Sequence, residues 1–162
     1  MKTVQHNAGW IIVLSVVLAY ALTAVPLPEW AVNWRPYWLA MVLIYWCMAL
    51  PERIGIGIAW VLGLFLDVLQ GTVLGQNALG FALIAWITIK SYQRIRVFPL
   101  FQQAIVICGY VLILQFFTLW IRGMMGVPPQ HWTFWMPAFT SMLLWPWIFI
   151  ILRDVRRKYH IF

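Results

Sequence analysis

The sequence predicts an all-α membrane protein, a polytopic bundle of six transmembrane helices in one domain. Of its 162 residues, 64% are hydrophobic and only 9% are charged, whereas soluble domains are about 45–50% apolar and about 25% charged. The mean hydropathy is +0.86. One span needs about 20 apolar residues, so six spans would take about 120 residues and leave only short loops and tails. We therefore expect a single integral membrane domain over residues 1–162, without a separate catalytic domain.

Apolar runs and prolines set the limits of the spans. The first run ends at Pro26. It has an Ala-x-Ala at residues 19–21, as signal peptides do, but no polar break follows, and we interpret it as an uncleaved helix. Pro36 suits the first turn of the second helix, and Pro51 ends it. The predicted spans are 9–25, 36–50, 54–74, 76–90, 101–121 and 132–152, with a basic tail at 153–162.

The second, third and fourth runs are short for a span of about 20 residues. A re-entrant hairpin within residues 54–90 is therefore a competing description of this region, and five spans are the alternative to six. Cationic residues favour six spans with both termini in the cytoplasm, because cytoplasmic loops carry an excess of Lys and Arg. Only Arg35 and Arg122 would then lie outside. The cations inside would be Lys2, Arg53, Lys90, Arg94, Arg96, Arg153, Arg156, Arg157 and Lys158.

This topology also explains the net charge of +7, which we do not interpret as a sign of nucleic-acid binding. Tryptophans 30, 34, 38, 120, 132 and 135 flank the outer loops and are expected to form an aromatic belt at the headgroup level. Cys47 and Cys108 lie in apolar runs, and the histidines are scattered. No metal-ligand spacing, phosphate loop or nucleophile–base set is found. We expect no metal, no cofactor and no enzymatic activity.

A stripe of small residues is the most informative pattern in the sequence. One step of four residues turns about 400° around a helix, so such residues follow a slowly drifting ridge. Small residues on a ridge allow a second helix to approach closely. The sequence therefore predicts a helix-packing or partner interface, filled either by another helix of this chain or by a partner. Its members are Gly55, Ala59, Gly63, Asp67, Gly71 and Gly75.

Asp67 is the one acidic residue inside a predicted span. It lies about 20 Å along the helix from Ile54, towards the outer side. A carboxylate at that depth needs partners. We predict an ion pair with Arg35 or Arg122 at the outer ends of neighbouring helices. Hydrogen bonds to nearby backbone or to Gln70 are the alternative.

The basic tail follows the last predicted span. Cations there act as an orientation signal and attract anionic lipid by about 1 kcal/mol each. A specific cytoplasmic partner is the second interpretation. The residues concerned are Arg153, Arg156, Arg157 and Lys158.

Five short segments carry a family resemblance. They are Arg35-Pro36-Tyr37-Trp38, Leu50-Pro51-Glu52-Arg53, Gly63-Leu64-Phe65-Leu66-Asp67-Val68-Leu69-Gln70-Gly71, Leu74-Gly75 and Leu144-Trp145-Pro146-Trp147-Ile148-Phe149. Together they resemble the MreD family of rod shape-determining proteins of bacterial inner membranes, in particular its proteobacterial branch. The resemblance covers nearly the whole chain.

The resemblance implies a non-enzymatic scaffold that acts beside the bitopic protein MreC, the MreB filament, the RodA glycosyltransferase and a penicillin-binding transpeptidase. It also implies a fold similar to the substrate-binding subunits of energy-coupling-factor transporters. That similarity suggests an alternative function, the binding subunit of a small-molecule (vitamin-type) importer. An outward-facing pocket would then be lined by Asp67, Gln70, Gln76, Asn77, Arg35 and Arg122.

Overall fold

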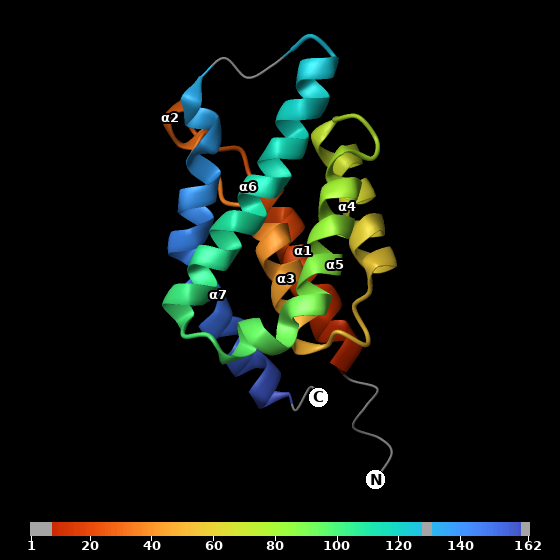
Figure 1. The fold of residues 1–162 in the computed structure, drawn as a ribbon, viewed down its shortest axis with the longest axis vertical. Helices are drawn as coiled ribbons and strands as arrows, with labels where there is room; N and C mark the ends of the chain where they lie inside the picture. The colour runs from red at the N-terminus through yellow and green to blue at the C-terminus, as the bar shows by residue number, and fades with distance from the viewer. Residues whose placement is uncertain (1–7, 128–130, 160–162) are drawn as a thin grey trace.

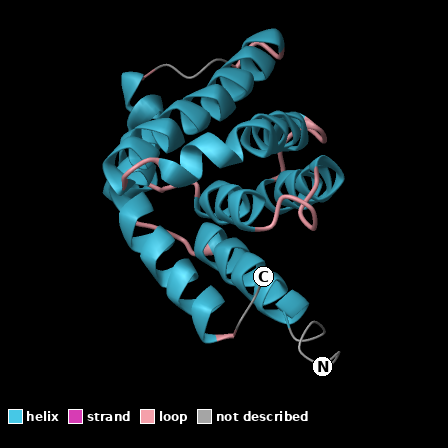
Figure 2. Ribbon diagram, turned by 60° about the horizontal axis from the view of Figure 1, so that its bottom comes forward, coloured by secondary structure: helices cyan, strands magenta, loops and turns pink. Residues whose placement is uncertain are grey.

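The computed structural model describes residues 8–127 and 131–159, and every regular element in that part of the chain is a helix (Figure 2). The all-α prediction is therefore confirmed. Lys2, His6 and residues 160–162 of the predicted tail lie outside the described residues. The elements are α1 (Ala8–Ala24), α2 (Glu29–Val32), α3 (Trp38–Ala49), α4 (Ile56–Gln70), α5 (Gln76–Val97), α6 (Leu100–Met124), the 3₁₀ turn η1 (Trp132–Trp135) and α7 (Met136–Lys158).

Each predicted span contains one long helix, but several ends differ from the prediction. The helix expected to reach residue 74 ends at Gln70, because Gly71 adopts a left-handed conformation with φ of +67°. The helix expected to end at residue 90 continues to Val97, shortly before Pro99. The first part of the predicted basic tail is also helical, since α7 runs to Lys158. Arg and Lys are good helix formers, so a helix can continue beyond the apolar run that predicts it.

Two of the described helices are long and apolar enough to cross a membrane, by length and composition. They are α6 and the combined stretch Trp132–Lys158. The stretches Gly9–Ala24, Trp38–Ala49 and Ile56–Gln70 are apolar but shorter. The number of crossings stays a prediction.

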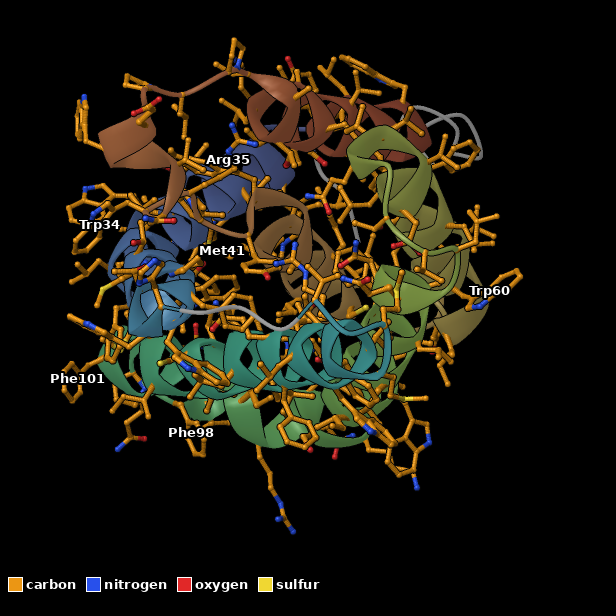
Figure 3. All side chains as sticks on the ribbon, turned by 90° about the horizontal axis from the view of Figure 1, so that it is seen from above. Trp34, Arg35, Met41, Trp60, Phe98 and Phe101 are labelled. Carbon is orange, nitrogen blue, oxygen red and sulfur yellow. The ribbon has the colours of Figure 1, made fainter. Side chains whose placement is uncertain are left out.

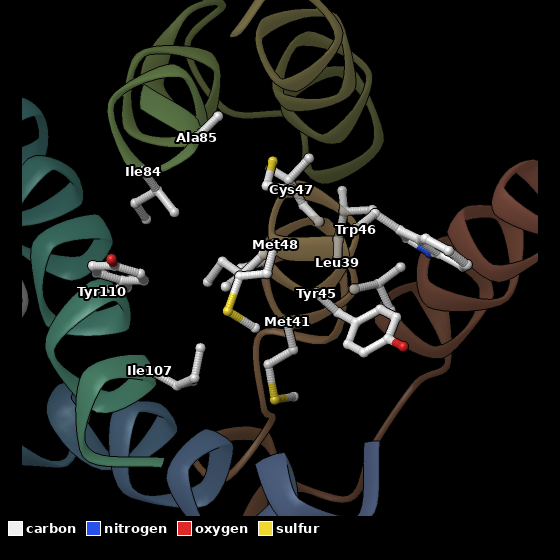
Figure 4. Close-up of a cluster of buried hydrophobic side chains, with 14 of the residues drawn as sticks. Leu39, Met41, Tyr45, Trp46, Cys47, Met48, Ile84, Ala85, Ile107 and Tyr110 are labelled. Atoms are coloured by element: carbon white, nitrogen blue, oxygen red, sulfur yellow. The ribbon is translucent and has the colours of Figure 1, made fainter. Parts of the chain in front are cut away.

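α3 forms the centre of the bundle. Ten of its twelve residues, Leu39 to Met48, are buried, which is the pattern of a helix that is apolar all round and enclosed by others. It packs against α1, α5 and α7, and seen from above it lies inside the ring of the other helices (Figure 3). Its side chains radiate in all directions, with Cys47 on the side of α4 and α5 and Tyr45 on the side of α1 and α7 (Figure 4).

The bundle has two chemically different ends (Figure 1). We call one the loop end; it holds α2, the turn between α4 and α5, the end of α6 and η1. We call the other the basic end; it holds both described termini, the loop between α3 and α4 and the turn between α5 and α6. Arg35 and Arg122 belong to the loop end. The basic end has Arg53, Arg94, Arg96, Arg153, Arg156, Arg157 and Lys158, with Lys90 two turns up α5.

Candidate functional site

The carboxylate of Asp67 joins the end of α4 to the beginning of α5. Asp67 is fully buried. Its Oδ1 accepts three hydrogen bonds of 2.9 Å, from the Thr72 hydroxyl and from the backbone N–H and side-chain amide of Asn77. Its Oδ2 accepts a fourth, also of 2.9 Å, from the backbone N–H of Gly75. Four donors therefore surround one buried carboxylate.

The arrangement follows from the chemistry of a helix start. The first N–H groups of a helix have no partner inside it and carry a partial positive charge. Asn77 is the second residue of α5, and Gly75 is its N-cap. Asp67 thus acts as a cap supplied by the preceding helix. The Asn77 amide also donates to Gln70 Oε1 at 3.2 Å, which adds a second link between the two helices.

The turn between α4 and α5 requires two glycines. Gly71 and Gly75 have φ of +67° and +100°, a region that favours glycine. The Gly71 N–H bonds to the carbonyl of Val68 at 3.3 Å, and the Thr72 N–H bonds to that of Asp67 at 3.0 Å. This pair of bonds is a Schellman motif, which satisfies the last carbonyls of α4.

The prediction that all six residues of the stripe form one helical packing ridge is therefore wrong, because the packed part is shorter. Gly71 and Gly75 lie in the turn, and Gly55 is the N-cap of α4; a Cβ added at any of these three would meet no atom within 4 Å. The middle of the stripe packs against α5 of the same chain. A Cβ on Gly63 would lie 2.6 Å from the backbone nitrogen of Ala78, so the two backbones touch. Ala59 is fully buried one turn before it.

The predicted ion pair of Asp67 with Arg35 or Arg122 is also wrong. The only salt bridge among the described residues joins Arg153 to Asp154 at 4.0 Å. Arg35 instead donates to the carbonyls of Thr23 (2.8 Å) and Val25 (2.5 Å), where α1 ends. Free carbonyls and the negative end of the dipole attract a cation there, while local donors already satisfy Asp67. The alternative of backbone hydrogen bonds is the one observed.

Sequence reasoning did not assign Thr72 and Asn77 as partners of Asp67. Both follow it within ten residues, beside two glycines. An intramembrane acid followed at once by a glycine-rich turn and Thr or Asn is the signal that could have identified them. Gln70 contacts the carboxylate only indirectly, through Asn77.

A pocket of about 320 Å³ opens at the loop end of the bundle. Figure 3 shows Arg35 pointing inward between helices, while Trp34 and Trp60 point away from the bundle. Five of the six residues expected to line an outward pocket do so; Asp67 does not, because its oxygens face the α4–α5 turn. The five are Arg35, Gln70, Gln76, Asn77 and Arg122.

The predicted basic tail forms the last turns of α7. Arg157 and Lys158 are exposed, whereas Arg153 and Arg156 are partly buried. The Arg153 guanidinium lies 5.8 Å from the ring centre of Phe149. The cations of the tail thus divide into an exposed pair and a pair held against the bundle.

Comparison with known proteins decides the family. The family model described as rod shape-determining protein MreD matches residues 5–155. Rod shape-determining protein MreD of Haemophilus influenzae is 34% identical over 150 residues, which cover 92% of this chain and 93% of that relative.

The chain belongs to the MreD family. The predicted family is therefore confirmed. Membership in this family also makes the chain a membrane protein with a role in rod shape determination. No solved structure matches the chain. The similarity to energy-coupling-factor subunits stays a prediction.

Proposed function

We propose that the protein is a non-enzymatic scaffold of the cell-elongation machinery in the bacterial inner membrane. In this role it maintains rod shape by linking the MreB filament and MreC to lateral-wall peptidoglycan synthesis by RodA and a penicillin-binding transpeptidase. Membership in the MreD family carries this proposal.

The proposal includes six membrane crossings with both termini in the cytoplasm. The position of both described termini at the basic end supports an even number of crossings (Figure 1). The distribution of Lys and Arg supports this orientation. Among the described residues, only Arg35 and Arg122 lie at the loop end, and the other cations lie at or near the basic end. α3 has 12 residues, about 18 Å of helix. Because it is enclosed by other helices, it does not have to match the bilayer thickness itself.

Polar side chains inside the bundle serve mainly to connect its elements. The Trp46 indole N–H donates to Ser15 Oγ at 2.9 Å, which ties α3 to α1. The backbone N–H of Tyr37 donates to Ser141 Oγ at 3.0 Å, which ties the start of α3 to α7. Such bonds specify which helices meet when lipid provides no hydrophobic reason for them to do so. They support a structural role.

A partner helix would bind to the outside of this bundle, because α5 fills the middle of the small-residue stripe. α1 and α4 are neighbours, since the Tyr20 hydroxyl donates to the Leu62 carbonyl at 2.5 Å. Both helices expose large apolar side chains, among them Val17, Leu18 and Phe65. These faces suit contact with lipid tails or with a transmembrane partner such as MreC.

Purification of the tagged chain from its native membrane in mild detergent, with mass spectrometry of the co-eluting proteins, tests the scaffold. Recovery of MreC and the wall-synthesis enzymes would support it. Val17→Trp and Phe65→Ala would probe the exposed faces, with Trp147→Ala on the exposed side of α7 as the matched control. Unchanged recovery with both variants would remove the α1 and α4 faces from the interface.

The loop-end pocket favours a second candidate, the binding subunit of a small-molecule importer. Its volume of about 320 Å³ lies at the lower limit of ligand sites, which run from about 300 to 1,000 Å³. Two arginines in its lining would suit an anionic ligand. Co-elution of ATPase subunits together with a bound small molecule would replace the scaffold by this function.

A further inference from the structure

A second pocket lies at the basic end of the bundle, away from the Asp67 turn and from the loop-end pocket. Its volume is about 140 Å³, roughly ten times the 10–15 Å³ that one water needs. A group of several non-hydrogen atoms therefore fits. The pocket is lined by Tyr45, Met48, Ala49, Arg96, Gln103, Phe149 and Arg156.

Tyr45 is the unusual residue in this lining, because its buried hydroxyl has no hydrogen-bond partner among the described residues. Tyr45 is only 2% exposed, and no described protein group lies within hydrogen-bond distance of its hydroxyl. A buried hydroxyl without a partner is destabilising, because its hydrogen bonds to water are lost on burial and are not replaced. Its ring is fixed by edge-on contacts with Trp46 and Phe149, at 5.3 and 5.6 Å between ring centres. The hydroxyl is thus a donor held in place.

The charged side chains that line this pocket are both cationic. They are Arg96 from α5 and Arg156 from α7. Neither lining arginine has a carboxylate within 4.0 Å among the described residues. Gln103 is uncharged; its amide N–H group donates to the carbonyls of Ile95 and Phe98, and its Oε1 accepts from the Trp145 indole N–H at 3.4 Å.

We propose that the pocket formed by Tyr45, Arg96 and Arg156 binds the phosphate oxygens of an anionic phosphate ester. Guanidinium groups bind phosphate through charge-assisted hydrogen bonds, and the Tyr45 hydroxyl supplies a neutral donor beside them. The ligand is either the headgroup of an anionic phospholipid or a free phosphate ester. The pocket lies at the end of the bundle where a lipid headgroup of one leaflet would be found, beside exposed apolar side chains of α5 and α6 such as Val97 and Phe101.

The test is native mass spectrometry of the full-length chain in mild detergent with added phosphatidylglycerol, and with phosphatidylcholine as the uncharged comparison. Tyr45→Phe removes the hydroxyl alone, and Arg96→Gln and Arg156→Gln remove one charge each. Arg94→Gln and Arg157→Gln lose the same charge at the same end without lining the pocket. A charge-assisted bond is worth about 1.5–3 kcal/mol, so each pocket arginine variant should weaken phosphatidylglycerol binding about tenfold or more. Tyr45→Phe should weaken it about fivefold.

Inorganic phosphate and glycerol 3-phosphate, added as competitors, distinguish the two sources of the ligand. Displacement of phosphatidylglycerol at millimolar glycerol 3-phosphate would assign the pocket to a free phosphate ester. Resistance to it would assign the pocket to a lipid. The proposal is overturned if all four arginine variants weaken binding equally, since that is a general charge effect, or if Tyr45→Phe binds as tightly as the unmodified chain. Arg96 is exposed, so its variant keeps the test informative even if a replacement at Tyr45 perturbs folding.

Discussion

Replacement of Asp67 by Ala should destabilise the bundle more than any other single loss of charge. The change removes an acceptor that receives four hydrogen bonds of 2.9 Å. A hydrogen bond between helices in a membrane protein contributes about 0.6 kcal/mol on average. Hydrogen bonds in proteins generally contribute up to about 1.5 kcal/mol each. Four such bonds give a loss of about 2–6 kcal/mol in the free energy of unfolding.

Replacement by Asn should cost less, because three of the four donors keep their acceptor. An asparagine with its oxygen at the position of Oδ1 would still accept from Thr72 and from both donors of Asn77. Its side-chain NH2 group would then face the backbone N–H of Gly75. One hydrogen bond is lost, and two hydrogen-bond donors point at each other. We expect a loss of about 1–3 kcal/mol.

The assay is reversible unfolding in mixed micelles of mild detergent with increasing SDS, followed by the fluorescence of the tryptophans. Asp154→Ala is the matched control, since this acid is exposed and its contact with Arg153 spans 4.0 Å; its effect should stay within about 0.5 kcal/mol. A double-mutant cycle adds a second criterion, with strong coupling of Asp67 to Asn77 and little coupling to Arg35. The reasoning would be refuted by a loss below 1 kcal/mol for Asp67→Ala, or by the reverse order of the two couplings.

Three further substitutions test the local geometry by the same unfolding assay. Gly63→Leu should prevent α4 and α5 from meeting and destabilise the bundle by about 3 kcal/mol or more. Gly57→Leu, on an open face of α4, is the control and should cost less than about 1 kcal/mol. Equal effects of the two substitutions would contradict the close approach of the helices. Gly71→Ala should cost about 1–2 kcal/mol because of its positive φ, and a neutral result would argue against the left-handed turn. Arg35→Gln should leave carbonyls of α1 without donors and cost about 1–3 kcal/mol; an unchanged midpoint would show that these bonds contribute nothing.

The positions of the helices could be predicted because they depend on composition alone. A run of apolar residues that ends at a proline or a glycine predicts an apolar helix without knowledge of the rest of the chain. Two helix ends at the basic end were not predicted correctly, since α5 continues through Arg94 and Arg96 to Val97 and α7 continues to Lys158. Hydropathy locates segments that are removed from water by lipid or by other helices, and helix propensity is a separate property.

The details of the site required knowledge of the turn between α4 and α5. A spacing of four residues treats Gly71 and Gly75 as the continuation of one helical face. In the structure both are turn residues, and their glycine character is due to positive φ rather than to close packing. The same turn brings Asn77 to Asp67, so the acid needs no distant arginine. A periodic pattern cannot reveal the residue at which its helix stops.

The state of Asp67 bears on the choice between a scaffold and a transporter. It is the one buried Asp, Glu, Lys or Arg among the described residues. A carboxylate in a proton or ion pathway exchanges partners with water or with a chain of polar groups. The carboxylate of Asp67 is instead occupied by donors from Thr72, Gly75 and Asn77, all within ten residues of it. These contacts fix the relative position of two helices, so the most costly polar group in the bundle is used to hold its shape. This use favours a protein that positions its partners over one that moves a solute.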